Sequence, residues 1–140
     1  MRAAGALTAV ALSLPVAAQD TRSAVHQSLA VPDTPVMVGG QLDLDACFGV
    51  GLVTGSSLSK SHEAAVLTSP GPGQAVINWV PTGRHVYLCE ERNGWTGVVY
   101  RLDGDLAGCG VSGPQERRRA YDGPCHSGWV ASGRLSLAAG

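Results

Sequence analysis

An all-β fold is predicted by three features of the sequence. The 140-residue chain contains 19 glycines and 8 prolines, residues that interrupt helices, so little room remains for long ones. No window of about ten residues beyond the N-terminal apolar stretch shows helical periodicity. Short runs rich in β-branched and aromatic residues recur between Gly- and Pro-containing turns. Such spacing is typical of a small barrel or sandwich.

The predicted strands follow one another from residue 47 to the C-terminus. In chain order they span residues 47–53, 64–67, 75–80, 86–89, 95–100, 129–130 and 135–137. The Asn93-Gly94 pair between two β-rich runs is a strong hairpin signal. Gly94 and Gly128 each precede a tryptophan, and we expect both glycines to adopt a positive φ at a corner. Residues 101–124 have no such run and are expected to form a long loop.

Residues 1–18 have the pattern of an export signal. Arg2 provides a positive charge, an apolar run follows, and Val16-Ala17-Ala18 offers the small residues that a signal peptidase requires. The apolar run spans about 14 residues, whereas a membrane helix needs roughly 20. We therefore expect cleavage after Ala18, a periplasmic or secreted mature protein, and no stable membrane span after cleavage.

The rest of the chain divides by composition into two parts. Residues 19–44 contain no cysteine and no aromatic residue, so they are expected to form a flexible linker. All the aromatic residues and cysteines lie beyond them, and residues 45–140 are predicted to fold as one small domain. The formal net charge of -1 does not suit a protein that grips nucleic-acid phosphates, so no nucleic-acid partner is expected.

The four cysteines indicate disulfide bonds, because an exported chain meets an oxidising compartment. Four cysteines allow three pairings, among which the sequence alone does not choose. We favour Cys109–Cys125, which bracket one irregular loop, and this leaves Cys47–Cys89 to join the first strand to a central one. A zinc site is not expected, since no C-x-x-C or H-x-x-x-H spacing occurs.

Two motifs with possible chemistry lack the sequence context that they need. Residues 108–113 satisfy G-x-G-x-x-G, but Pro114 follows instead of a helix that could receive phosphates. Cys125 stands beside His126, yet adjacent residues of an extended chain point to opposite faces, and Cys125 is expected to be oxidised. No G-x-S-x-G occurs. The sequence therefore predicts no catalytic residue, no metal and no cofactor.

Residues 66–130 resemble a bacterial Src-homology-3-type (SH3b-like) domain of cell envelopes. The matching pieces are residues 67–73 (LTSPGPG), 80–86 (VPTGRHV), 93–100 (NGWTGVVY) and 127–130 (SGWV). Residues 121–130 also resemble the Tyr-x-Gly-Pro-Cys-x-Ser-Gly-Trp-Val ending of a cysteine-bearing subfamily. The resemblance implies a small five-stranded SH3-like barrel, which here would carry a long disulfide-closed loop. It also implies a non-catalytic module that recognises peptidoglycan peptide or an envelope protein.

The expected binding surface combines the long loop with aromatic side chains. Trp95 and Trp129 are expected in the core, because a small domain needs their large buried area. Tyr87 and Tyr100 are the better groove candidates, since a tyrosine can keep its hydroxyl in water. Arg117, Arg118 and Arg119 are either a solvated turn or an anion contact. The alternative to a binding module is a small exported hydrolase or inhibitor that acts through residues 101–126.

Overall fold

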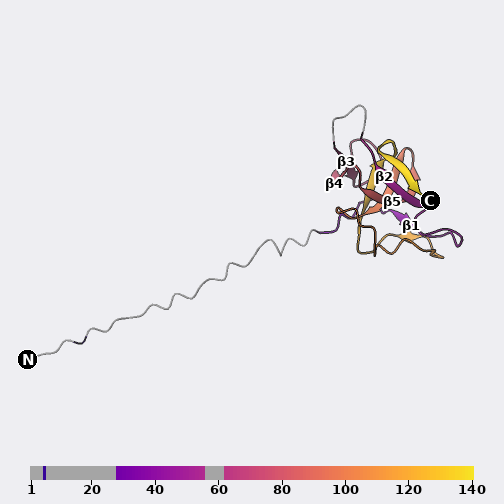
Figure 1. The fold of residues 1–140 in the computed structure, drawn as a ribbon, viewed down its shortest axis with the longest axis horizontal. Helices are drawn as coiled ribbons and strands as arrows, with labels where there is room; N and C mark the ends of the chain where they lie inside the picture. Colours follow the sequence, from indigo (N-terminus) through magenta and orange to yellow (C-terminus); the bar gives the residue numbers. More distant parts are fainter. Residues whose placement is uncertain (1–4, 6–27, 56–61) are drawn as a thin grey trace, which may run out of the picture.

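The structure is a computed structural model that describes residues 28–55 and 62–140, together with Gly5. The expected export signal (apart from Gly5) and residues 19–27 of the expected linker lie outside the described residues. The strands are β1 (Met37–Val38), β2 (Gly49–Val53), β3 (Glu63–Leu67), β4 (Val76–Pro81), β5 (His85–Arg92), β6 (Trp95–Tyr100), β7 (Arg119–Ala120), β8 (His126–Ala131) and β9 (Leu135–Ala139). A single 3-10 turn, η1 (Ser132–Arg134), precedes β9 (Figure 1). The described chain is therefore all-β, as predicted.

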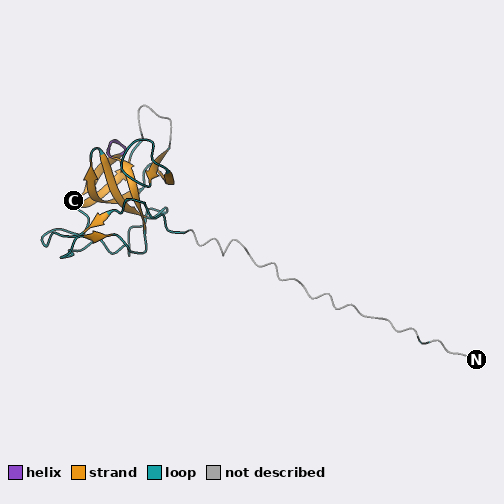
Figure 2. Ribbon diagram, turned by 180° about the vertical axis from the view of Figure 1, so that it is seen from behind, coloured by secondary structure: helices purple, strands orange, loops and turns teal. Residues whose placement is uncertain are grey.

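Seven strands form one antiparallel sheet in the order β4-β3-β8-β6-β5-β2-β9. The edge strands β4 and β9 do not pair, so the sheet is not closed into a barrel. Arg134 nevertheless draws three strand ends together, since its side chain donates to the carbonyl oxygens of Thr54 and Glu63 at 2.9 and 3.0 Å. The strands β1 and β7 form a separate two-stranded sheet, which lies beside the larger one (Figure 2). All seven predicted runs are strands of the larger sheet.

The larger sheet is packed on both faces. Because successive strand residues point to opposite faces, β6 sends Val99 to one side and Val98 and Tyr100 to the other. The strand β8 divides in the same way between Trp129 and Val130. On the Trp129 side the buried partners include both disulfides and the N-terminal residues Val36 and Val38. A cover on each side explains why the central strands are buried almost throughout.

The expectation of a flexible linker is wrong for residues 30–38, which are an integral part of the fold. Val36 and Val38 are almost fully buried, and the Tyr121 N–H donates to the Val36 carbonyl at 2.8 Å. The Thr34 N–H donates to the Thr68 carbonyl at 3.0 Å. Val36 and Val38, at alternate positions, cover the face of the sheet that carries Trp129. This segment needs no aromatic residue of its own to do so. The folded domain thus begins well before residue 45.

The two corner glycines have different roles. Gly94 has a φ of +85°, as the hairpin requires. Gly128 does not have a positive φ. A Cβ on Gly128 would instead lie 2.4 Å from Cγ1 of Val66, so β8 needs a glycine there because β3 approaches closely. The expectation of a positive φ at Gly128 is therefore wrong.

Both favoured disulfides, Cys47–Cys89 and Cys109–Cys125, are present. The first joins Cys47, two residues before β2 begins, to Cys89 in β5. The second closes the loop between β6 and β8, whose only regular element is the two-residue β7. Among the residues that the structure describes, no helix has the length and apolar character that crossing a membrane demands.

Glu90 is a buried carboxylate that joins three segments of the chain. Its Oε1 accepts from the Met37 N–H at 2.8 Å, which fixes β1 against β5. Its Oε2 accepts from Arg92 Nε at 3.2 Å and from an Arg118 guanidinium nitrogen at 3.0 Å. A buried carboxylate is tolerated only when it is paired and hydrogen-bonded, and these three donors meet that requirement.

Candidate functional site

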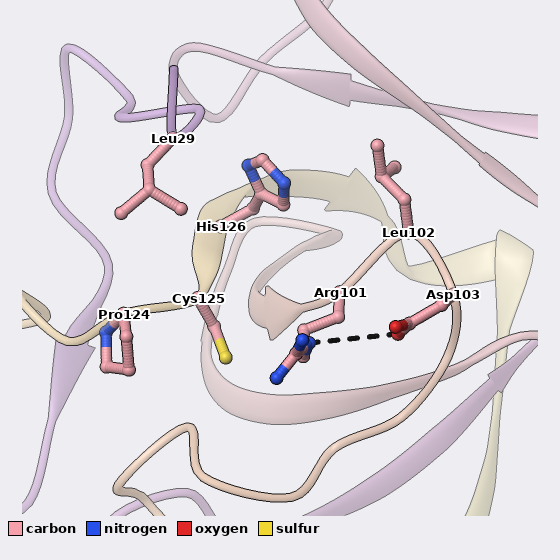
Figure 3. A pocket seen from close by; sticks show the side chains of 7 residues that line it. All are labelled: Leu29, Arg101, Leu102, Asp103, Pro124, Cys125 and His126. Atoms are coloured by element: carbon pink, nitrogen blue, oxygen red, sulfur yellow. Dashed lines mark ion pairs between the residues drawn. The ribbon is translucent and has the colours of Figure 1, made fainter. Parts of the chain in front are cut away.

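A cleft lies between the long loop, the start of β8 and Leu29. Its volume is about 500 Å³, and Figure 3 shows the side chains that line it. The lining residues are Leu29, Arg101, Leu102, Asp103, Pro124, Cys125 and His126. We call it the Arg101 cleft. Apolar walls with a few converging polar groups are typical of ligand sites.

Arg101 provides the positive charge of this cleft. Its side chain is 46% exposed, and its Nε lies 3.8 Å from Asp103 Oδ1. A second guanidinium nitrogen donates to the Ala107 carbonyl at 3.5 Å. Both contacts are long, and a guanidinium has five N–H donors in a planar fork. Arg101 can therefore offer two parallel donors to a carboxylate that enters the cleft.

His126 forms the floor of the cleft and is held in one tautomer. Its Nδ1 accepts a hydrogen bond from the Ala30 N–H at 2.9 Å, so the proton of the neutral ring is on Nε2. The ring stacks on Tyr100 with 5.3 Å between centroids. Burial, and to a lesser degree the positive charge of Arg101, hold the pKa of His126 below its ordinary value. The neutral imidazole is thus the favoured form.

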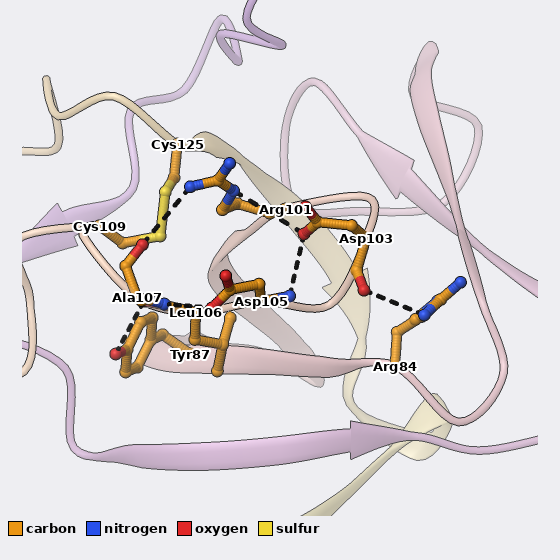
Figure 4. A network of polar contacts seen from close by, with 9 residues as sticks. All are labelled: Arg84, Tyr87, Arg101, Asp103, Asp105, Leu106, Ala107, Cys109 and Cys125. Carbon is orange, nitrogen blue, oxygen red and sulfur yellow. Dashed lines mark hydrogen bonds and ion pairs between the residues drawn. A yellow bond between two sulfur atoms is a disulfide. The ribbon is translucent and has the colours of Figure 1, made fainter.

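The loop that borders the cleft is built from short local turns. The Asp105 N–H donates to Asp103 Oδ1 at 2.9 Å, and the Ala107 N–H donates to Asp105 Oδ1 at 3.0 Å (Figure 4). The Arg84 side chain, which extends from the β4–β5 turn, donates to the Asp103 carbonyl at 3.0 Å. The disulfide Cys109–Cys125 closes the loop next to Arg101. These bonds fix the wall from which Arg101 projects.

Tyr100 does not line a groove, so its expected role in binding is wrong. Its side chain is fully buried in the core, on the face of the sheet that also carries Val98 and Val130. Its hydroxyl has no hydrogen-bond partner within the described residues, although the Asn78 side chain lies near enough to lower its pKa slightly. Burial dominates and raises the pKa of Tyr100 to about 12.

Tyr87 is half-buried, and it lies on a different part of the surface from the Arg101 cleft. Its hydroxyl donates to the Leu106 carbonyl at 3.2 Å, which ties the loop to β5 (Figure 4). Its ring borders a separate hollow of about 210 Å³ beside Asp45 and Phe48. Tyr87 thus supports the loop, and the structure does not bring it together with Tyr100 in one groove.

The three consecutive arginines do not form a common anion site. Arg118 is paired with the buried Glu90, and Arg119 with Asp122 and Gln115. Arg117 is exposed and makes no ion pair within 4 Å to any described residue. Arg119 lies in β7, beside β1. Arg118 therefore attaches the loop to the large sheet, whereas the contacts of Arg119 with Gln115 and Asp122 lie within the loop.

The two candidate core tryptophans differ. Trp129 is fully buried, as expected, and its indole N–H donates to the Thr34 carbonyl at 2.8 Å. Trp95 is half-buried and borders a hollow of about 310 Å³ with Arg92 and Asn93. Within the described residues, no group of three or more His, Cys, Asp or Glu side chains is placed to hold a metal ion.

Sequence reasoning missed the side chains that line the Arg101 cleft. Arg101 and His126 are the first residue after β6 and the first residue of β8, so the pairing of these two strands brings them to one end of the sheet. Leu29 arrives from a segment that was expected to be a linker. Arg101 could have been found as the only basic residue directly after a predicted strand that leads into the loop. Comparison of this chain with protein-family models, with curated proteins and with solved structures gave no match.

Proposed function

We propose that this chain is an exported, non-catalytic binding module of the SH3-like class that holds a carboxylate-bearing peptide in the Arg101 cleft. The peptide belongs to the cell wall or to an envelope protein. The observation that carries the proposal is the exposed guanidinium of Arg101 above the apolar walls formed by Leu29 and Leu102. Such a cleft suits a ligand with one carboxylate and an apolar stem.

The SH3-like assignment is supported by the order of the strands along the chain. Short antiparallel strands joined by tight turns, with Gly94 before Trp95 and Gly128 before Trp129, agree with the motifs that carry the resemblance. Arg134 links the ends of β2, β3 and β9, so strands from both halves of the open sheet lie close together. Export is supported by two disulfides and by the signal-like residues 1–18.

Binding is favoured over catalysis by the state of the candidate nucleophile. Cys125 is bonded to Cys109, so it has no thiolate with which to attack a substrate. His126, its neighbour, accepts the Ala30 N–H at Nδ1 and stacks on Tyr100, so it is not paired with a nucleophile. The Arg101 cleft therefore has donors for a bound anion and no assembled pair of nucleophile and base.

The test compares a short peptide that has a free C-terminal carboxylate with the same peptide as its amide. We expect the free acid to bind more tightly, and added salt to weaken its binding, because an exposed Arg contact is screened over about 10 Å at 0.1 M ionic strength. Arg101→Gln should abolish the difference between acid and amide. Arg117→Gln, which removes an exposed arginine elsewhere in the loop region, is the matched control and should bind as the parent does.

The cell wall as a source is tested with purified peptidoglycan sacculi. Co-sedimentation of the parent and of Arg117→Gln, but not of Arg101→Gln, would support a wall peptide. Binding of the soluble acid without sedimentation would point to an envelope protein. Equal binding of acid and amide by the parent, together with sedimentation that Arg101→Gln leaves unchanged, would overturn the proposal.

A further inference from the structure

Residues 28–31 lie along the edge of β8 where β3 does not pair with it, and we call these residues the strap. The strand β3 pairs with β8 only at Leu67 and Trp129, so the edge of β8 before Trp129 is not covered by β3. The strap covers it: the Ser127 N–H donates to the Ala30 carbonyl at 3.1 Å. The Ala30 N–H in turn donates to His126 Nδ1. One residue of the strap thus exchanges two hydrogen bonds with the start of β8.

The strap separates two hollows that share a wall. Leu29 lines the Arg101 cleft, whereas Ser28 and Ala30 line a neighbouring hollow of about 240 Å³. Leu102 and His126 line both. In Figure 3 the His126 ring lies between Leu29 and Leu102. If the strap moved away, the two hollows would join and the N–H of Ser127 would be open to a ligand.

The hydrogen bond from the Ala30 N–H of the strap to His126 Nδ1 requires a neutral ring. Protonation of Nδ1 would direct an N–H at the Ala30 N–H, so two donors would face one another and the bond would be lost. A protonated His126 would instead be a donor that suits a carboxylate oxygen, as do Ser127 N–H and Arg101. The strap and a carboxylate ligand therefore require opposite protonation states of the same ring.

Few other charged or titratable groups face this ring. The strand β6 and the residues after it contribute Tyr100, which stacks on the ring, and Arg101 and Asp103, which line the cleft. The strap contributes Ser28, Leu29 and Ala30, and β4 contributes Ile77 and Asn78, all of them uncharged. Arg101 opposes protonation of His126, and a bound carboxylate would favour it.

We infer that His126 selects between the strap and a carboxylate ligand, so that the Arg101 cleft opens and binds more tightly in mild acid. The inference rests on the proposed function for its ligand, but the release of the strap does not. By linkage, a ligand that prefers the protonated ring gains affinity as the pH falls and raises the pKa of His126 when it binds. The inference adds a regulation, and a second anion-binding side chain, to the proposed site.

Release of the strap is measured first, without any ligand. Nuclear magnetic resonance of the parent protein reports the His126 tautomer and the hydrogen exchange of the Ala30 amide between about pH 7.5 and pH 5. We expect the Ala30 amide to lose its protection, after correction for intrinsic exchange, as His126 becomes protonated. Protection that persists after His126 is protonated, or a ring that stays neutral throughout the range, would overturn the inference.

Variants then separate the acceptor from the charge. In His126→Asn the amide oxygen can accept the Ala30 N–H at any pH, so the protection of Ala30 should no longer depend on pH. His126→Phe removes the acceptor and should expose Ala30 at all pH values. His85→Asn, at the exposed start of β5, is the matched control and should behave as the parent does. Because the first measurement uses the parent, misfolding of a variant does not remove the test.

Ligand binding is measured with the free-acid peptide and its amide at the same two pH values. We expect about fivefold or more tighter binding of the acid at pH 5, the usual lower end of site-to-site coupling, and no such gain in His126→Asn. If neither peptide binds while the Ala30 amide is still released, the proposed function fails and the switch stands. If the acid binds equally at both pH values in the parent, the selection by His126 is refuted and the proposed function stands.

Discussion

The indole N–H of Trp129 donates to the backbone carbonyl of Thr34 at 2.8 Å. This bond joins a fully buried aromatic side chain of the sheet to the segment that covers it. Trp129 therefore needs residues 30–38 both to exclude water and to satisfy its only polar atom. It also shows why the two Gly-Trp motifs, which look alike in the sequence, are expected to have unequal energetic roles.

Trp129→Ala should lower the free energy of unfolding by about 3–5 kcal/mol, as large-to-small changes in cores do. Trp95→Ala should cost less than half as much, because Trp95 is half-buried and borders a hollow. Denaturant unfolding followed by circular dichroism measures both. An equal cost for the two variants would contradict the difference in burial.

Glu90→Ala should destabilise the fold by about 3 kcal/mol, because it leaves the Met37 N–H without its acceptor and two arginines without their partner. Arg118→Ala should cost at most about 1 kcal/mol, since that side chain is mostly exposed. Arg117→Ala serves as the control and should stay within about 0.5 kcal/mol of the parent. Chemical denaturation gives the three values, and the order Glu90, Arg118, Arg117 is the prediction.

Tyr100→Phe should leave stability unchanged or raise it slightly, because the buried hydroxyl has no partner to lose. Tyr121→Phe should cost about 1–2 kcal/mol, since the Tyr121 hydroxyl donates to the Cys109 carbonyl and accepts the Cys125 N–H. The same hydroxyl-to-hydrogen change thus has two outcomes that thermal unfolding can compare. A larger loss at Tyr100 than at Tyr121 would mean that the Tyr100 hydroxyl is bonded in solution.

Stability should fall in alkali as Tyr100 ionises. Its pKa is about 12 in the folded state and near 10 when exposed, so the folded state holds the proton more strongly. This contribution is complete below pH 10 and is lost as the pH rises towards 12. Absorbance at 295 nm should show that Tyr100 ionises late, and Tyr100→Phe should lack that late step. His126 acts in the opposite range: its lowered pKa means that stability declines as the pH falls below its ordinary 6.5.

The protein should contain no free thiol, because the structure has no unpaired cysteine among the residues described. Thiol titration of the denatured, unreduced protein tests this. In the chain-entropy estimate the bond that spans 42 residues contributes about 4 kcal/mol and the bond that spans 16 residues about 3 kcal/mol. Replacing Cys47 and Cys89 together should therefore destabilise the fold more than replacing Cys109 and Cys125 together.

The seven strands of the large sheet were predictable because each is specified locally, by a β-rich run between turn residues such as Asn93-Gly94. The parts that were missed depend on contacts between distant residues. Val36 and Val38 lie in a short aliphatic run without aromatic residues. They join the core only because one face of the distant sheet needs a cover. Two-residue strands such as β1 and β7 carry too little pattern to be recognised.

The sequence indicated only the region of the candidate site. The long loop between Arg101 and Cys125 was expected to carry function, which stays a prediction, and the Arg101 cleft lies against this loop. Its residues were misassigned for two physical reasons. Glu90 is buried and takes Arg118 as a partner, which a run of arginines does not reveal. The residue type of Tyr100 suggested a hydroxyl in contact with solvent. The register of β6 instead directs this side chain into the core.

The contacts of Ala30 and Thr34 with the end of the chain also have a consequence for the time course of folding. Ala30 and Thr34 are bonded to His126 and Trp129, which lie 96 and 95 residues further along the chain. The segment with Ala30 and Thr34 is synthesised early, but it can form these bonds only after β8 has been synthesised. A fold closed by such distant contacts has a high contact order, for which folding takes milliseconds to seconds. During this interval the face of the sheet that carries Trp129 lacks its cover of residues 30–38.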